Sequence, residues 1–399
     1  MFNRNIQLII VIASCVLTLI STDILLPSMP QIAHYFAVPP SDVKMLISIF
    51  MTGQFATVLF WGVIADQLGR SRTLLIGMLI FFIGSVLSVI APTINLLLAC
   101  RFIQGAGAVV VPVAGWALIQ DLFPKDDGAR IMSWVGTLTA VIPLFAPAIG
   151  GKIDVLYGWH TNLYCITVFS AFVCVTMMCS PKQQTAPNAV IPTLKERMGI
   201  YSRIMKNKTF VSYIALFGLL NCGEWCFLTM APFYYAHKQI AADQMGLLLM
   251  LTSMGFVFGS LLASHLFKRI GIDKTINTGI QLAIISSLLL ITGEYMQWNG
   301  HQIYNAVGIG IYILSSALLW GGTTSRALQC FDDYRGSASA IRSLILLCFA
   351  AFGTYSGRLV SHEKIYHVGF FLFFMALSAL IVFHNKELKG ERLEVDAVF

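Results

Sequence analysis

Twelve long apolar runs constrain this chain more than any other feature of its sequence. Each is close to the length of about 20 residues that an α-helix needs to cross the hydrocarbon of a bilayer. The runs cover roughly residues 6–29, 44–62, 73–91, 94–119, 131–151, 161–180, 209–231, 244–266, 275–295, 302–323, 337–358 and 367–384. Because a helix satisfies its own backbone hydrogen bonds where no water is present, the pattern predicts an all-α membrane protein with twelve transmembrane helices.

The composition fits this class of protein. Hydrophobic residues make up 57% of the chain and charged residues 11%, against about 45–50% and 25% in a typical soluble domain. The net charge of +7 does not indicate nucleic-acid binding, because the basic residues lie in short loops instead of forming one binding face. The 9 Cys lie mostly inside apolar runs and form no C-x-x-C pair, so we expect neither a disulfide, a metal nor a cofactor.

The loops differ in their content of Lys and Arg. One set of loops carries most of these residues, whereas the other set carries only Lys44, Lys152, Lys238, Arg358 and Lys364. The positive-inside rule therefore places both termini in the cytoplasm.

Residues 181–208 form the one long polar connection and divide the runs six and six. We expect a six-helix bundle over 1–180, a cytoplasmic linker over 181–208, and a second bundle with a short tail over 209–399. Within the linker, apolar residues recur at helical spacing among Lys and Arg, which predicts a helix lying on an anionic membrane surface. A calmodulin-type partner site is an alternative. These apolar residues are Leu194, Met198, Tyr201 and Met205.

The two halves repeat weakly. Leu68–Thr73 aligns with Ile270–Thr275 at an offset of 202 positions (270 − 68). Such a repeat predicts two pseudo-symmetric bundles related by an axis along the membrane normal, with a substrate site near the midplane. Because Asp66 falls opposite Lys268, the second copy is degenerate, and we expect a switching role of this turn to be confined to the first half.

A charged turn with two glycines joins the second and third runs, and it contains Gly62, Asp66, Gly69, Arg70 and Arg72. We expect Gly62 to let helices approach closely and Gly69 to permit a tight reversal. Asp66 is expected to pair with Arg70 or with a helix N-terminus. The string resembles the loop between the second and third spans of the major facilitator superfamily, which implies a role in gating.

Four charged residues stand out inside the runs: Asp23, Arg101, Glu224 and Arg342. Each costs about 2.5–3.5 kcal/mol on insertion scales, so each needs a reason to be there. Asp23 and Arg101 each lie roughly 10 Å from the outer end of their helix, which allows them to meet. One interpretation is a static ion pair that fixes packing. The other is a proton site whose affinity shifts as water enters.

The other two ionisable residues lie in the second half. Glu224 follows Asp23 by 201 positions, so the two are predicted to face each other across a central cavity; alternatively Glu224 is neutral and bonded to Asn221, Trp225 or the backbone. Arg342 either extends its charge toward the cytoplasmic surface or contacts substrate. Nearby aromatic residues are candidates for stacking on a substrate. They are Trp116, Trp225, Phe227, Tyr234, Tyr235 and Trp320.

The fifth run contains Pro143, Ala146-Pro147-Ala148 and Gly150-Gly151, which resembles the antiporter signature of exporter branches of the superfamily. Together with the strings Ser21–Pro30, Asp66–Arg72, Arg101–Gly105, Gln120–Lys125 and Gly158–His160, it makes the chain resemble the Bcr/CflA drug-efflux family. The resemblance is strongest over residues 20–160. It implies proton-coupled export of drugs or metabolites across a bacterial inner membrane.

Carried onto this chain, the resemblance makes Asp23 the proton-linked carboxylate and Arg101 its partner. It assigns gating to Asp66, Gly69 and Arg70, to which we add Gly62, Arg72, Pro147, Gly150 and Gly151. Glu224 and Arg342 depart from the family pattern and favour a polar substrate, either a zwitterion or a carboxylate-bearing metabolite such as a siderophore. Glu224 is expected either to bind part of the substrate or to carry a second proton, beside Asp23 and Arg101. The expected substrate site comprises Asp23, Arg101, Glu224, Trp225 and Arg342.

The leading hypothesis is therefore a proton-coupled antiporter that exports a small organic molecule by alternating access. A dedicated exporter of a polar metabolite, an uptake symporter and a non-transporting receptor are the alternatives. An enzyme is not expected, because no His-rich or Ser/His/Asp set is clustered in the spans. The expected partners are a small-molecule substrate, protons and the lipid bilayer, with no nucleic acid, and we expect a monomer.

Overall fold

The computed structural model describes residues 2–123, 125–180, 194–296, 302–331 and 335–384. All regular structure within these ranges is helical and no strand is present, so the predicted all-α membrane fold is confirmed. Eleven helical segments in this part of the chain are long and apolar enough to cross a membrane. The predicted fifth span lies on α7 (Lys125–Tyr157), a helix of 33 residues whose side chains are described only in part.

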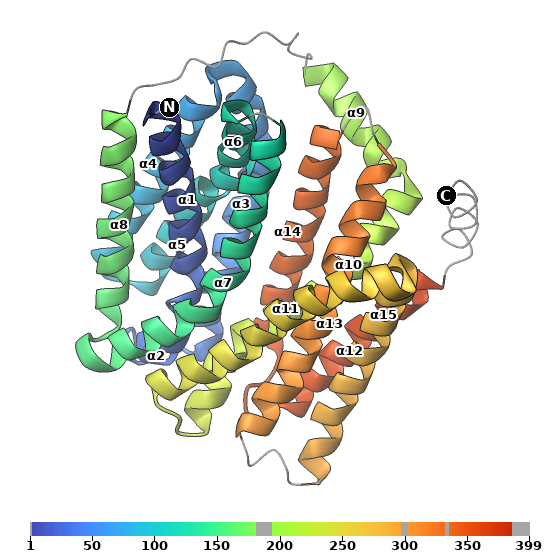
Figure 1. The fold of residues 1–399 in the computed structure, drawn as a ribbon. Helices are drawn as coiled ribbons and strands as arrows, with labels where there is room; N and C mark the ends of the chain where they lie inside the picture. The colour runs from blue at the N-terminus through green and yellow to red at the C-terminus, as the bar shows by residue number, and fades with distance from the viewer. Residues whose placement is uncertain (1, 124, 181–193, 297–301, 332–334, 385–399) are drawn as a thin grey trace. The chain divides into compact units, whose positions relative to one another are not determined.

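The first half of the chain forms the blue to green helices of Figure 1. In chain order they are α1 (Phe2–Asp23), a 3₁₀ turn η1 (Leu26–Ser28), α2 (Met29–Tyr35), α3 (Pro40–Leu68), α4 (Arg70–Val89), α5 (Ile94–Ala108), a π-helical turn η2 (Val111–Gly115), α6 (Trp116–Leu122), α7 and α8 (Trp159–Cys179).

Two of the predicted spans in this half are interrupted at prolines. Pro27 lies in η1 between α1 and α2, and Pro112 lies in η2 between α5 and α6. Proline lacks the backbone N–H that would continue the ladder and clashes with the preceding turn, so each helix changes its winding there. The first interruption follows Asp23 directly and makes Asp23 the last residue of α1.

The second half contains α9 (Leu194–Lys206), α10 (Lys208–His237), α11 (Ala242–Ile270), α12 (Ile272–Tyr295), α13 (Gln302–Gln329), α14 (Arg335–Leu359) and α15 (Tyr366–Phe383).

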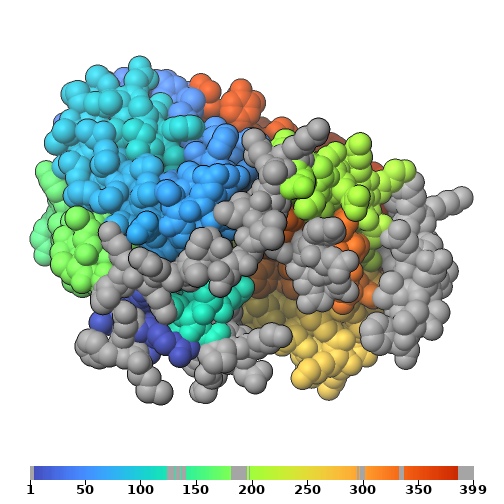
Figure 2. Space-filling model, turned by 90° about the horizontal axis from the view of Figure 1, so that it is seen from above, coloured from blue at the N-terminus to red at the C-terminus, as the bar shows by residue number. Residues whose placement is uncertain are grey.

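The linker forms the helix that its spacing predicts, as α9. Met198 and Met205 of this helix are 58% and 47% exposed. In Figure 2 its yellow-green atoms lie at the surface of the face that is shown. An apolar exposed side among basic residues is what a helix on a membrane surface needs. The remaining part of the linker, residues 181–193, lies outside the described ranges.

Packing divides the chain into two compact units. The first comprises Met1–Ile191 with Ala231–Met250, and the second comprises Pro192–Met230 with Leu251–Phe399. The end of α10 and the start of α11 therefore pack with the helices of the first half. One basic residue of the first unit also differs from expectation. Lys44, which the loop pattern groups with outer loops, is buried within α3, and its ammonium lies 5.8 Å from the ring centre of Phe233.

Glycines allow α3 and α5 to pack backbone to backbone in the first unit. A Cβ on Gly53 would collide with the carbonyl of Phe102, and one on Gly105 would collide with the carbonyl of Phe50. The indole N–H of Trp61 donates to the carbonyl of Ala106 over 2.7 Å and strengthens the same contact. Small residues permit this close approach in membranes, where packing replaces hydrophobic driving force.

The close approach predicted for Gly62 is wrong in this structure. A Cβ built on Gly62 meets no atom within 4 Å. Gly62 and Gly53 both belong to α3, so that helix carries one glycine at a tight contact and one facing open space.

These two glycines give a matched test of the packing. Gly53→Ala should lower the free energy of unfolding by about 1–3 kcal/mol, because the methyl group forces α3 away from α5. Gly62→Ala should leave stability unchanged or slightly raised, since alanine is the better helix former. Thermal unfolding of the purified protein in detergent measures both, and equal midpoints for the two variants would contradict the α3–α5 contact.

Candidate functional site

The turn between α3 and α4 has the backbone that its sequence predicts. Gly69 adopts φ 82° and ψ 150° and separates the two helices. Side chains with a Cβ avoid this region, so the reversal requires glycine. The hydroxyl of Thr73 donates to the carbonyl of Gly69 over 2.9 Å and secures the first turn of α4.

Arg70 forms an ion pair with α6. Its guanidinium lies 2.6 Å from the carboxylate of Asp121 and also donates to the carbonyl of Ala117. The turn is thereby tied to α6, at the end of the fourth span. Asp66 and Arg72 are exposed. The string Gln120–Lys125 points to Asp121 as part of a motif, but one sequence does not reveal which arginine it binds.

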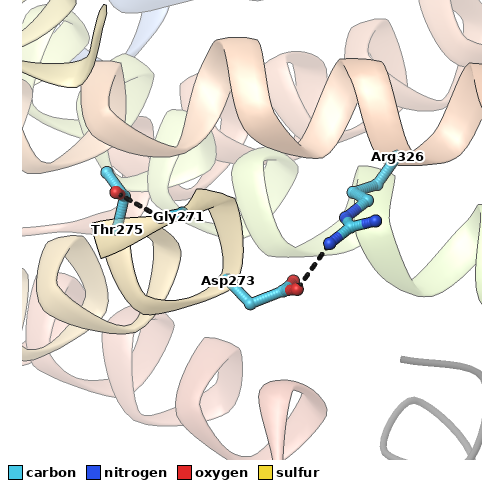
Figure 3. Close-up of polar contacts among 4 residues, drawn as sticks. All are labelled: Gly271, Asp273, Thr275 and Arg326. Atoms are coloured by element: carbon cyan, nitrogen blue, oxygen red, sulfur yellow. Dashed lines mark hydrogen bonds and ion pairs between the residues drawn. The ribbon is translucent and has the colours of Figure 1, made fainter. Parts of the chain in front are cut away.

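The second unit repeats this turn with its charges exchanged. Gly271 adopts φ 83°, and the hydroxyl of Thr275 donates to its carbonyl over 2.7 Å, as at Gly69 and Thr73. Here the acidic residue belongs to the turn: Asp273 accepts a hydrogen bond of 2.8 Å from Arg326 on α13 (Figure 3). The repeat predicted from the sequence is therefore present in backbone geometry, and the second copy has an ion pair of its own.

A buried polar cluster surrounds Arg101 on α5, whose side chain is 1% exposed. Its guanidinium donates to the carbonyl of Ser21 through two nitrogens, each at 3.2 Å, and to Oε1 of Gln104 at 2.9 Å. Gln104 in turn donates to the hydroxyl of Ser85 on α4 over 2.9 Å. The ring of Phe50 on α3 lies 4.9 Å from the guanidinium carbon. Helices α1, α3, α4 and α5 thus meet around the guanidinium of Arg101.

The structure brings Asp23 into this cluster. Asp23 is 8% exposed, and its charge acts on the guanidinium of Arg101. Burial and the negative end of the α1 dipole both oppose an ionised carboxylate at this position. Arg101 counters both effects, because it binds the α1 carbonyl of Ser21 and provides the opposite charge. The contacts of Arg101 therefore join the end of α1 to α5 beside Asp23.

The predicted antiporter segment of α7 contacts the backbone of two other segments of the first unit. A Cβ on Gly150 would collide with the carbonyl of Ile24, and one on Gly151 would collide with the carbonyl of Ala242 on α11. The carbonyl of Pro147 meets a glycine of α11 in the same way. The helix therefore packs against the break in the first span, beside Asp23, and against the start of α11.

Glu224 lies in a small polar group of the second unit. It is half-buried and accepts a hydrogen bond of 3.4 Å from Asn221 on the same helix. Its charge also acts on Tyr312 of α13, whose fully buried hydroxyl has no hydrogen-bond partner in the described part of the chain. The sequence analysis did not identify Tyr312, because a tyrosine within an apolar span carries no distinguishing pattern. Trp225 is half-buried beside Glu224 on α10.

Arg342 lies at a different level from Glu224. Gly353 of α14 packs on the carbonyl of Cys222 of α10, and Gly357 packs on that of Cys226, so the register between the helices is 131 positions (353 − 222). Arg342 then lies level with position 211 (342 − 131), which is 13 residues (224 − 211) from Glu224. At 1.5 Å per residue the axial separation is roughly 20 Å, so the structure does not join these two charges into one pocket.

Comparison with known proteins identifies the family. The model of the Major Facilitator Superfamily matches residues 11–354. A bicyclomycin resistance protein homolog of Haemophilus influenzae is 26% identical over 90% of this chain and 89% of that protein. The multidrug resistance protein MdtL of Vibrio parahaemolyticus is 27% identical over 83% of each chain, and the chloramphenicol resistance protein CraA of Acinetobacter baumannii is 21% identical over 82% and 79%.

Solved structures give the same fold. The D-xylose–proton symporter superposes with a TM-score of 0.73 at 15% identity and covers 94% of this chain and 97% of its own. The nucleoside transporter NupG gives a TM-score of 0.73 at 12% identity, with 95% and 100% covered. The chain therefore belongs to the major facilitator superfamily, and its relatives are those of the Bcr/CflA-like drug-efflux branch.

Proposed function

We propose that this multi-pass membrane transporter is a proton-coupled antiporter that exports a small organic molecule by alternating access. The observation that carries the proposal is the buried assembly of Asp23 and Arg101 at the break in the first span. The drug-resistance names of the relatives support export in preference to uptake. A bacterial inner membrane, cytoplasmic termini and a monomeric state complete the proposal.

Asp23 is the proton-linked carboxylate in this proposal. While α5 is packed against the end of α1, Arg101 stabilises the ionised form. A movement that separates the two helices leaves the carboxylate in a low-dielectric site without its partner, and it then takes up a proton. Protonation is thus tied to helix packing, which is the linkage that an antiporter needs.

Replacement of Asp23 tests the coupling. Asp23→Asn retains size and hydrogen bonding but cannot ionise, so it should abolish proton-driven accumulation while exchange of substrate down its own gradient persists. Chloramphenicol and bicyclomycin are the first probes, in inverted vesicles with an imposed proton gradient. The exposed carboxylate Glu363, as Glu363→Gln, is the control and should export normally. Export by Asp23→Asn at the normal rate against a gradient would refute the assignment.

We propose a gating role for the turn formed by residues 62–73 and for the glycines of α7. The ion pair Arg70–Asp121 holds the turn against α6, and its counterpart Asp273–Arg326 holds the second turn against α13. Gly150 and Gly151 allow α7 to close against the first span and α11. Each contact involves only a few residues. It can therefore form in one state of the transport cycle and break in another.

The gate should control turnover and contribute little to affinity. Gly69→Val forces a β-branched residue into a glycine conformation at a cost of about 1–3 kcal/mol, and Asp66→Ala removes a charge of the turn. Both should slow transport while substrate binding to the purified protein persists. Gly199→Val is the control, because Gly199 on α9 has open space around its Cα. A parallel loss of binding would place the turn in the substrate site or in the fold.

A dedicated exporter of a polar, carboxylate-bearing metabolite is the second candidate. The group of Glu224, Asn221 and Tyr312 favours it, because a carboxylate and a buried hydroxyl can bind a polar substrate. Trp225 is the further substrate contact of this candidate, whereas Arg342, which the sequence also places in the substrate site, lies at another level. The roughly 20 Å between the levels of Glu224 and Arg342 means that one small molecule does not reach both in this packing.

Glu224 separates the two candidates experimentally. Glu224→Gln should change the set of transported compounds, or the dependence of export on pH, more than it changes thermal stability. The measurement compares uptake of neutral, cationic and carboxylate-bearing probes into inverted vesicles for both proteins. Identical substrate range and pH profile in the variant would assign Glu224 to packing and leave the generic drug exporter as the better description.

A further inference from the structure

Asp154 is a buried carboxylate that neither the sequence motifs nor the proposed coupling uses. It lies on α7, three residues (154 − 151) after Gly151, and is only 3% exposed. Neither oxygen of its carboxyl group has a hydrogen-bond partner in the described part of the chain. An ionised carboxylate at such a site would lose its hydration without replacement, at a cost of several kcal/mol.

The surroundings of Asp154 are polar but uncharged. The hydroxyl of Ser28 in η1 lies close enough to act on the carboxyl group, although it is not in hydrogen-bond geometry. Asn162 of α8 donates to that hydroxyl oxygen over 3.1 Å and to the carbonyl of Gly150 over 3.1 Å. Because the Ser28 oxygen already accepts a bond, its own proton is available to the carboxyl group. Three elements thus meet at Asp154 and offer it a hydroxyl but no cation.

Within the described part of the chain, burial and a hydroxyl act on Asp154, and no charge from a neighbouring element does. Its helix packs against α1, η1, α8 and α6 and touches α11. Burial and the Ser28 hydroxyl act on the carboxyl group, and none of the titratable residues on these elements acts through its charge. The titratable residues at this end of those elements are Asp23, His160 and Asp243, with Lys152 and Tyr157 on α7 itself. Asp121 precedes α7 and lies at its other end. Burial therefore favours the neutral, protonated form while this packing is closed and raises the pKa of Asp154 to about 6.

We propose that Asp154 is a second proton-binding site of the transporter, which holds its proton while α7 is packed against η1 and α8 and releases it when water enters this contact. The inference deepens the proposed function, because it adds a proton site to the half that contains Asp23. It does not require Asp23 to be the coupling residue. No bond other than the O–H bond is formed or broken, and the released proton passes to the entering water.

Infrared spectroscopy tests this directly in the full-length protein in detergent. The C=O stretch of a protonated carboxyl group should be present in the wild type at a pH below about 6 and reduced by one group in Asp154→Asn. Asp243→Asn is the matched control on α11. Unlike Asp154, the carboxylate of Asp243 has a hydrogen-bond partner in the described part of the chain, the backbone N–H of Gln244 at 2.8 Å. Asp154→Asn is isosteric with the neutral acid and should fold.

A second variant and a second background keep the test decisive. Ser28→Ala removes the one group that stabilises the ionised form, so the signal should titrate at higher pH than in the wild type. In an Asp23→Asn background the Asp154 signal should persist, which separates this inference from the role of Asp23. Identical spectra for the wild type and Asp154→Asn below about pH 6, or a Ser28→Ala titration at unchanged pH, would overturn the proposal.

Discussion

The packing of the first unit depends on the hydrogen bonds and the ring contact that the guanidinium of Arg101 makes. Its partners come from the end of α1, from α3 and, through Gln104, from α4. Removal of one partner from a buried charge costs about 3–5 kcal/mol, because the other charge is left uncompensated. The contacts of Arg101 therefore hold α1 against α5, and the closely packed glycines of α3 and α5 bring the neighbouring helix close to the guanidinium.

The two halves share their turn geometry but differ in buried chemistry. Positive φ angles and threonine hydroxyls recur at Gly69 and Gly271. Around Glu224, however, the second unit provides an amide and a phenol where the first provides a guanidinium. The repeated backbone controls how spans connect, whereas the buried side chains were free to diverge. In this way one half of the fold can bind a proton while the other half binds a substrate.

The sequence predicted the spans, the linker helix and the reversal at Gly69, because apolar length and glycine conformation are local properties. It also predicted that Asp23 and Arg101 lie at similar depth, since helical rise converts sequence position into distance. Contacts between distant segments were not accessible in this way. The partner of Arg70, the open space at Gly62 and the burial of Lys44 follow from how helices face one another, which a single sequence does not encode locally.

Asp154 illustrates the same limit. It follows the predicted fifth run in a stretch with Lys152 and Tyr157, and by pattern it resembles an ordinary residue at the end of a helix. Only the packing of η1 and α8 around α7 makes it a buried acid. Tyr312 is a comparable case. The burial of its hydroxyl without a hydrogen-bond partner in the described part of the chain becomes evident only when α10 and α13 are placed together.

The consecutive glycines of α7 have a mechanical consequence. Successive residues of an α-helix point about 100° apart, since 3.6 residues complete a turn. Gly150 faces the carbonyl of Ile24 and Gly151 faces that of Ala242, each with less room than a methyl group needs. Rotation of α7 about its own axis would bring side chains into both gaps, so this helix resists torsion. The helix can tilt, translate or separate from one neighbour. When it moves in this way it moves as one body and transmits displacement between the first span and α11.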